Sequence, residues 1–136
     1  MPFDEGDELV SVDELLAAAR STIERLTPDE AFAAIERGAA LIDIRPADQR
    51  ERDGSLPGAH VIPRNVLEWR LDPRSDHCDP ALARRDVQLI VICDEGYQSS
   101  LVAATLCRFG LDATDVVGGF QSWRSQGLRL SQAADS

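Results

Sequence analysis

The chain has 136 residues and 43% of them are apolar, which predicts one domain, since a chain of this size buries roughly two-thirds of its unfolded surface. Its 14 basic and 24 acidic residues leave a formal net charge of −10. That balance argues against a surface for nucleic acid or an anionic membrane, because both bind clustered positive charge. All the basic residues are arginine, which excludes Schiff-base catalysis and a Walker-type phosphate loop, since both need lysine.

The cysteines and the first residues of the chain indicate the compartment in which the protein works. Cys78, Cys93 and Cys107 are odd in number and widely spaced, so neither a disulfide framework nor a paired metal site is expected. No apolar run approaches the ~20 residues of a membrane span, and the acidic first residues do not resemble a signal peptide. We therefore expect a reducing, cytoplasmic environment.

The first predicted element is an amphipathic helix near the N-terminus. Ser11 and Glu14 form a capping box, which marks a helix start. Apolar residues then recur at helical spacing and predict a face that packs on the rest of the domain. That face comprises Val12, Leu15, Leu16, Ala19, Ile23 and Leu26. Residues 1–25 are therefore expected to be an acidic tail followed by this helix.

The remaining elements alternate between helices and strands. A second capping box, Thr27 with Glu30, starts a helix that Gly38 ends. The strands expected from short apolar runs are Ala39–Ile44, Ala59–Ile62, Gln88–Cys93 and Asp115–Val117. The helical stretches expected between them are Pro80–Arg85, Ser99–Phe109 and Gly119–Gln126. The third strand is apolar on both faces, which is typical of a buried parallel sheet, so the pattern predicts an α/β fold.

The strand-to-helix turn that begins at Cys93 is the best candidate site. Gly96 lies inside this turn and Ser99 opens the next helix. Ligands of open α/β sheets bind at the carboxyl ends of strands, beside helix N-termini. Backbone N–H groups and the positive helix end would face the Cys93 sulfur there and stabilise its thiolate. The same position also suits a buried cysteine that acts only as a small apolar residue.

The motif Cys93-x-x-Gly96-x-x-Ser99, followed by Ala103-Ala104, resembles the active-site loop of rhodanese-like sulfurtransferases. Three further segments resemble the family in the same order along the chain. They are Leu41–Arg45 with its Asp-x-Arg, Gly54–Pro63 with its PGA-x-x-IP, and Val117–Leu128 with its GG-x-x-x-W and GL. On this resemblance, residues 26–130 are identified as a single rhodanese-like domain, with a C-terminal tail at 131–136.

The resemblance implies a five-stranded, mainly parallel sheet flanked by helices on both faces, to which this chain adds its N-terminal helix. It also implies a sulfurtransferase in which Cys93 carries a sulfane sulfur as a persulfide and passes it to a thiol, cyanide or a protein acceptor. No metal and no organic cofactor is implied. The substrate-binding residues implied are Asp94, Glu95, Gly96, Tyr97, Gln98 and Ser99, with Arg64 as a further candidate.

The implied partners are a small sulfur donor or the persulfide of another protein, with no nucleic acid and no membrane. The chain itself is expected to be a monomer or a homodimer. Among the other residues, Asp43 and Arg45 are expected to form a structural polar network. Trp69 and Trp123 are expected to anchor the packing, and the Tyr97 ring is expected to be exposed at the mouth of the site.

Two features of the loop depart from the family's pattern. Gln98 stands where members commonly carry arginine, and Asp94 and Glu95 stand where thiosulfate-using members often carry basic residues. The two carboxylates would repel thiosulfate, so weak activity with that donor is expected unless Arg64 offsets them. A catalytically weak binding or regulatory module is therefore the alternative function. Cysteine phosphatases and arsenate reductases need Cys-x5-Arg, whereas the sixth residue after Cys93 is Ser99.

Overall fold

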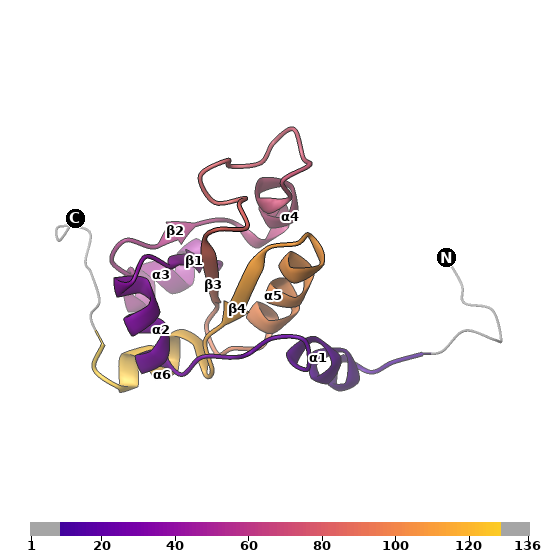
Figure 1. Ribbon diagram of the computed structural model, residues 1–136. Coiled ribbons are helices and arrows are strands. Elements are labelled where there is room, and N and C mark those ends of the chain that lie inside the picture. The colour runs from indigo at the N-terminus through magenta and orange to yellow at the C-terminus, as the bar shows by residue number, and fades with distance from the viewer. Residues whose placement is uncertain (1–8, 129–136) are drawn as a thin grey trace.

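A parallel sheet forms the centre of the computed structural model, which describes residues 9–128 (Figure 1). Its strands are β1 (Ala40–Asp43), β2 (His60–Val61), β3 (Gln88–Ile92) and β4 (Asp112–Asp115), in the spatial order β2-β1-β3-β4. All neighbouring pairs are parallel. The carboxyl ends of β1 and β3 are level, because Asp43 pairs with Ile92. Both ends therefore deliver the residues that follow them to one edge of the sheet.

The sheet has four strands where five were expected. The missing strand is reduced to Leu26, which forms a single parallel bridge with Val116. The Leu26 N–H donates to a carbonyl of the β4 end, and its own carbonyl accepts from Val117. Pairing stops there because Thr27 already caps the next helix and Pro28 has no N–H to donate.

Helices cover both faces of the sheet (Figure 1). They are α1 (Val12–Arg20), α2 (Pro28–Glu36), α3 (Ala47–Asp53), α4 (Leu67–Leu71), α5 (Gln98–Arg108) and α6 (Gly119–Ser125), with a 3-10 turn η1 (Arg64–Val66) before α4. Successive residues of β3 point to opposite faces. Leu89 and Val91 pack in the cluster formed with α4 and α5, whereas Ile90 and Ile92 pack in the cluster formed with α2 and α6.

The N-terminal helix α1 is shorter than its apolar pattern predicts, and it packs on α5 rather than on the sheet (Figure 1). The capping box of Ser11 and Glu14 is confirmed. Packing of the apolar face is confirmed only in part, since Ala19 is the buried residue of α1 and Val12 remains 70% exposed. Its first turn therefore contributes little to the core.

Two predictions of secondary structure were wrong. β4 spans Asp112–Asp115 rather than Asp115–Val117. Thr114 and Asp115 of this strand are polar but buried, and they form hydrogen bonds with the segment after α1. The strand therefore lacks an apolar pattern. Pro80–Arg85 forms turns rather than a helix.

Three further features correct or extend the sequence analysis. The short helices α3 and α4 were not predicted, since α3 has no buried residue and α4 has only five residues. Trp123 is buried as expected, but Trp69 is 58% exposed. Trp69 lies between Leu67 and Leu71, the two residues of α4 that face the core, and so points to the opposite side of that helix. No helix within residues 9–128 has the length and apolar character that a membrane span requires.

Replacing Ala19 with glutamate tests the docking of α1 on α5. Ala19 is 9% exposed, so a carboxylate at this position loses most of its contact with water, which costs about 1–3 kcal/mol. We expect Ala19→Glu to lower the free energy of unfolding by that amount in a urea titration. Ala17→Glu is the matched control, since Ala17 is exposed on the same helix. Equal stability of the two variants would contradict the packing of α1.

Candidate active site

Cys93 directly follows β3, an interior strand of the sheet. The alternation along β3 places its side chain on the α5 face, where it packs in the same cluster as Leu89 and Val91. The residue is 3% exposed. Its Sγ accepts a hydrogen bond from the Gly96 N–H, with 3.2 Å between nitrogen and sulfur. The sulfur therefore lies at the floor of the Cys93 loop, residues 93–98, and not at its rim.

The Cys93 loop packs backbone against backbone on the turn that opens α6. At Gly96, which has φ +88°, an added Cβ would lie 2.9 Å from the Gly118 nitrogen. At Gly119, with φ +60°, a Cβ would lie 2.6 Å from the Cys93 carbonyl oxygen and 2.7 Å from the Gly96 nitrogen. The Phe120 N–H donates to that Cys93 carbonyl at 2.8 Å. Gly96 of the loop and Gly119 of α6 are therefore both needed for the close backbone contact that shapes the loop.

A buried carboxylate ties the start of α5 to the end of β4. The Ser99 and Ser100 hydroxyls donate to Asp115 Oδ2 at 2.8 and 2.7 Å. Arg25 donates to both carboxylate oxygens, at 2.8 and 3.2 Å, and also to the Gly96 carbonyl at 3.0 Å. The Ser99 hydroxyl is therefore occupied by Asp115.

The carboxylate of Asp94 belongs to a polar cluster between α3 and α6. It accepts a hydrogen bond from Gln121 at 2.8 Å and lies 3.8 Å from the Arg52 guanidinium. Gln121 also donates to Asp53, which pairs with Arg52 and Arg124. The hydrogen bond from Arg52 is the main cause that holds the pKa of Asp53 well below its usual value. Asp94 is thus paired with cationic and amide groups outside the loop.

The other loop side chains face solvent. Glu95 and Gln98 are exposed, and the Tyr97 ring is 61% exposed, as the sequence analysis expected. The guanidinium of Arg20 lies 5.8 Å from the centre of the Tyr97 ring, within the range of a cation–π contact.

A cavity of about 440 Å³ opens beside the carboxyl ends of β1 and β2. Gln98 of the Cys93 loop lines it, as does Ile44, which follows β1. Cys93 does not line the cavity, but Ile44 packs in the same apolar cluster as Cys93 and donates its N–H to the last residue of β3. The cavity therefore lies at the same edge of the sheet as Cys93, and it shares Gln98 with the Cys93 loop.

Three arginines line this cavity: Arg45, Arg50 and Arg64. Arg64 pairs with Glu68 at 2.8 Å. Arg50 donates to a backbone carbonyl at 3.3 Å, and it has no carboxylate partner within residues 9–128. Neither Asp94 nor Glu95 is among the lining residues. The wall of the cavity is therefore more cationic than the sequence of the loop alone suggests.

Arg45 is fully buried, and its environment confirms the expected polar network. It forms a two-pronged ion pair with Asp43, donates to the Gly54 carbonyl at 3.0 Å and lies 3.8 Å above the centre of the Phe120 ring. Its Nη1 is buried and has no hydrogen-bond partner in the described part of the chain. A buried nitrogen of this kind normally finds an acceptor.

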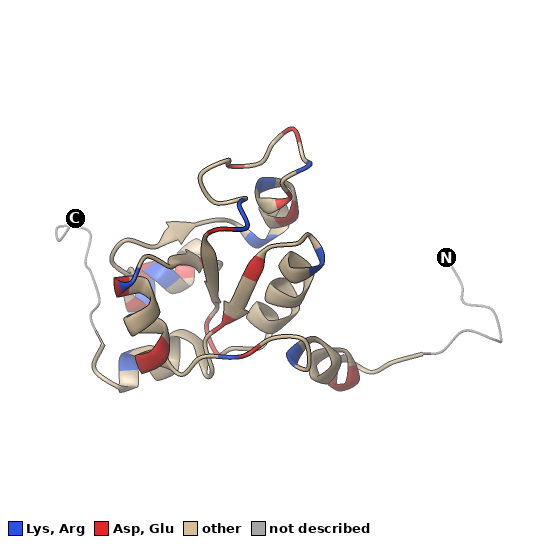
Figure 2. Ribbon diagram, in the orientation of Figure 1, with Lys and Arg blue, Asp and Glu red and all other residues tan. Residues whose placement is uncertain are grey.

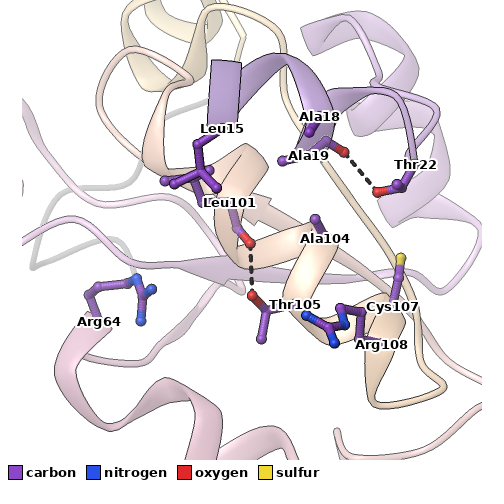
Figure 3. A pocket seen from close by; sticks show the side chains of 10 residues that line it. All are labelled: Leu15, Ala18, Ala19, Thr22, Arg64, Leu101, Ala104, Thr105, Cys107 and Arg108. Carbon is purple, nitrogen blue, oxygen red and sulfur yellow. Dashed lines mark hydrogen bonds between the residues drawn. The ribbon is translucent and has the colours of Figure 1, made fainter. Parts of the chain in front are cut away.

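A second cavity of about 560 Å³ lies between α1 and α5 (Figure 3). Leu15 of α1 and Leu101 of α5 both line it, as do Cys107 and Arg108 near the end of α5. Arg64 borders this cavity as well as the one beside the sheet. Within residues 9–128, no three His, Cys, Asp or Glu side chains gather as metal ligands would.

The model of the rhodanese-like domain family matches residues 27–126. The chain therefore belongs to the rhodanese-like domain family, and it has the family's α/β fold. Thiosulfate sulfurtransferase GlpE of Pseudomonas savastanoi pv. phaseolicola is 35% identical over 103 residues, 75% of this chain and 88% of the relative. Its namesake from Pseudomonas paraeruginosa is 31% identical over 106 residues, 76% of this chain and 86% of the relative. These relatives support a sulfurtransferase at the level of the family.

A solved structure from Rhodopseudomonas palustris is similar over more of the chain. It is described as a protein of unknown function and a possible tyrosine phosphatase. It has a TM-score of 0.82 and 32% identity, and it covers 96% of this chain and 99% of its own. That coverage is wider than residues 27–126, so the similarity includes much of the N-terminal segment.

Sequence reasoning missed three residues that hold the loop: Arg20, Arg25 and Asp115. Asp115 carries one signal, because an acidic residue within a predicted buried strand needs a partner. Nothing in the sequence indicates that Arg20 and Arg25 reach the loop, since about 70 residues or more separate them from Gly96.

The contact between Gly119 and the Cys93 loop leads to a direct test. Alanine in the left-handed region costs about 1–2 kcal/mol, and overpacking adds about 1–3 kcal/mol. We expect Gly119→Ala to lose more stability than Gly127→Ala, which has φ +73° but nothing within 4 Å of the added Cβ. We also expect only Gly119→Ala to slow alkylation of Cys93, measured with Cys78 and Cys107 replaced by serine. Equal effects of the two variants would show that the close contact does not shape the loop.

Proposed function

We propose that this protein is a single-domain sulfurtransferase that carries a sulfane sulfur as a persulfide on Cys93. The observation that supports it most directly is the hydrogen bond from the Gly96 N–H to Cys93 Sγ, at the carboxyl end of an interior strand. An N–H group aimed at a cysteine sulfur stabilises the thiolate, which is the nucleophilic form. The α5 N-terminus adds its partial positive charge to the same place.

The reaction has two steps and needs only the cysteine. The Cys93 thiolate attacks the outer sulfur of the donor, forming an S–S bond, while the rest of the donor leaves with the electron pair of the broken bond. A thiol, cyanide or a protein cysteine then attacks the outer sulfur of the persulfide, and Cys93 recovers its thiolate. Backbone N–H groups of residues 94–99 hold the negative charge of the persulfide between the two steps.

The arginine-lined cavity supports an anionic donor such as thiosulfate, the donor named for the GlpE relatives. In this proposal Arg50 and Arg64, which line the cavity, attract the anion. Asp94 lies 3.8 Å from the Arg52 guanidinium, so its repulsion of a dianion is smaller than the loop sequence implies. The exposed Glu95 carboxylate is screened by solvent.

A catalytically weak binding or regulatory module is the second candidate, because Cys93 is 3% exposed and does not line the cavity. A phosphatase is not proposed. The Cys93 loop contains no arginine, and the sixth residue after Cys93, Ser99, directs its hydroxyl to Asp115. The proposal includes a reducing cytoplasmic setting, where the free cysteines would persist, and a monomer or homodimer that meets a small donor or a protein persulfide.

Intact-mass analysis after incubation with sulfur donors tests the proposed persulfide. We expect a gain of about 32 Da, one sulfur atom, that cyanide or dithiothreitol removes. Cys93→Ser should abolish the gain, whereas Cys78→Ser and Cys107→Ser should keep it. Absence of the adduct with thiosulfate, polysulfide and a protein persulfide alike would favour the binding module. Turnover of an aryl phosphate would instead support a phosphatase.

Replacing Arg50 with glutamine tests the anionic donor. Losing one charge-assisted contact with an anion should lower kcat/KM for thiosulfate about tenfold, which corresponds to about 1.4 kcal/mol. Salt should weaken the wild-type reaction more than that of the variant. Arg37→Gln removes the same charge from an exposed position after α2 and should change nothing. An unchanged kcat/KM for Arg50→Gln would show that the cavity does not bind the donor.

A further inference from the structure

Two arginines of the N-terminal segment bind the same carbonyl of the Cys93 loop. Arg20 Nη2 donates to the Gly96 oxygen at 2.7 Å, and Arg25 Nη2 donates to it at 3.0 Å. Figure 2 shows basic positions at the end of α1 and in the segment that continues from it below β4. Two cationic donors on one backbone oxygen are more than the loop needs to satisfy that group, since a single hydrogen bond would do so.

This carbonyl belongs to the peptide that links Gly96 to Tyr97. A trans peptide is planar, so its C=O and N–H point in opposite directions. None of the peptide bonds between described residues is cis. Holding the Gly96 oxygen outward therefore turns the Tyr97 N–H away from the two guanidinium groups and toward the inside of the loop. Charge drawn to the carbonyl oxygen also makes that N–H a stronger donor.

Each arginine is itself held in place. Arg25 forms a two-pronged ion pair with the buried Asp115, at 2.8 and 3.2 Å. Arg20, the last residue of α1, donates to the Ser100 hydroxyl at 3.0 Å and lies over the Tyr97 ring. α1 packs along α5, the helix that the loop opens. The two guanidinium groups are therefore fixed by the loop, by the start of α5 and by β4.

Both arginines lie before residue 27, where the match to the rhodanese-like domain begins. The GlpE relatives align with about three-quarters of this chain, whereas the Rhodopseudomonas palustris structure covers 96% of it. The contacts with the Gly96 carbonyl therefore come from a segment added to the common domain. A surface helix added only for stability would not need to place two charges on the active-site loop.

We infer that Arg20 and Arg25 are positioning residues for the Cys93 loop, which hold the Gly96–Tyr97 peptide so that its N–H faces the inside of the loop. The effect of the two arginines on turnover rests on the proposed function. Their effect on the reactivity of Cys93 requires only its thiol. The N-terminal segment thereby becomes part of the active site, acting through the loop without touching the substrate.

Arg20 is the better residue to change, because removing Arg25 would leave the Asp115 carboxylate buried without its cation. We expect Arg20→Ala to slow alkylation of Cys93 by iodoacetamide about threefold to tenfold at neutral pH. It should lower kcat more than it changes KM. Arg20→Lys, which keeps one cationic donor, should recover at least half of the lost rate.

Arg37→Ala is the control for removing a surface arginine, and thermal unfolding of every variant separates loop effects from loss of folding. Alkylation of Arg20→Ala at the wild-type rate would overturn the inference. A slow Arg20→Ala that Arg20→Lys does not improve would also overturn it, because packing and not charge would then be responsible. If the wild type forms no persulfide, the proposed function fails, while the alkylation rates still decide the role of Arg20.

Discussion

The buried carboxylate of Asp115 is the interaction on which the site depends. It lies at the end of β4 and is fully buried, so its charge is tolerated only because Arg25, Ser99 and Ser100 donate to it. Those donors come from the N-terminal segment and from the start of α5. One carboxylate thus joins three parts of the chain directly beneath the Cys93 loop. Removing Arg25 would leave the charge uncompensated in the interior, whereas removing either serine hydroxyl would take one hydrogen bond from it.

The charges of this acidic protein are arranged so that its arginines serve the site. Arg20 and Arg25 hold the loop from one side, and Arg45, Arg50 and Arg64 line the cavity beside it. A net charge of −10 therefore coexists with five arginines around the site, of which Arg25, Arg45 and Arg64 are paired with carboxylates. Net charge describes solubility and long-range attraction, whereas chemistry depends on the few charges within contact distance.

Local signals were sufficient for much of the fold. Both capping boxes are confirmed because the bonds that define them join residues three apart. β3 was predictable because burial on both faces requires an unbroken apolar run. The position of β4 was predicted wrongly because its buried residues include polar ones, which form hydrogen bonds with the segment after α1. The sequence near β4 does not indicate these distant partners. The extent of α1 was overestimated because an apolar face does not say what covers it.

The sequence by itself determined the family, the candidate nucleophile Cys93 and the glycines of its loop, because a strand end, a tight turn and a helix start are set by neighbouring residues. It also led to the interpretation of Asp94 as a charge facing the substrate. Only the tertiary structure paired Asp94 with Gln121 and brought Arg20 and Arg25 to the Gly96 carbonyl. Such contacts join residues far apart in the chain, and they depend on how α1, β4 and α6 pack around the loop rather than on any local preference.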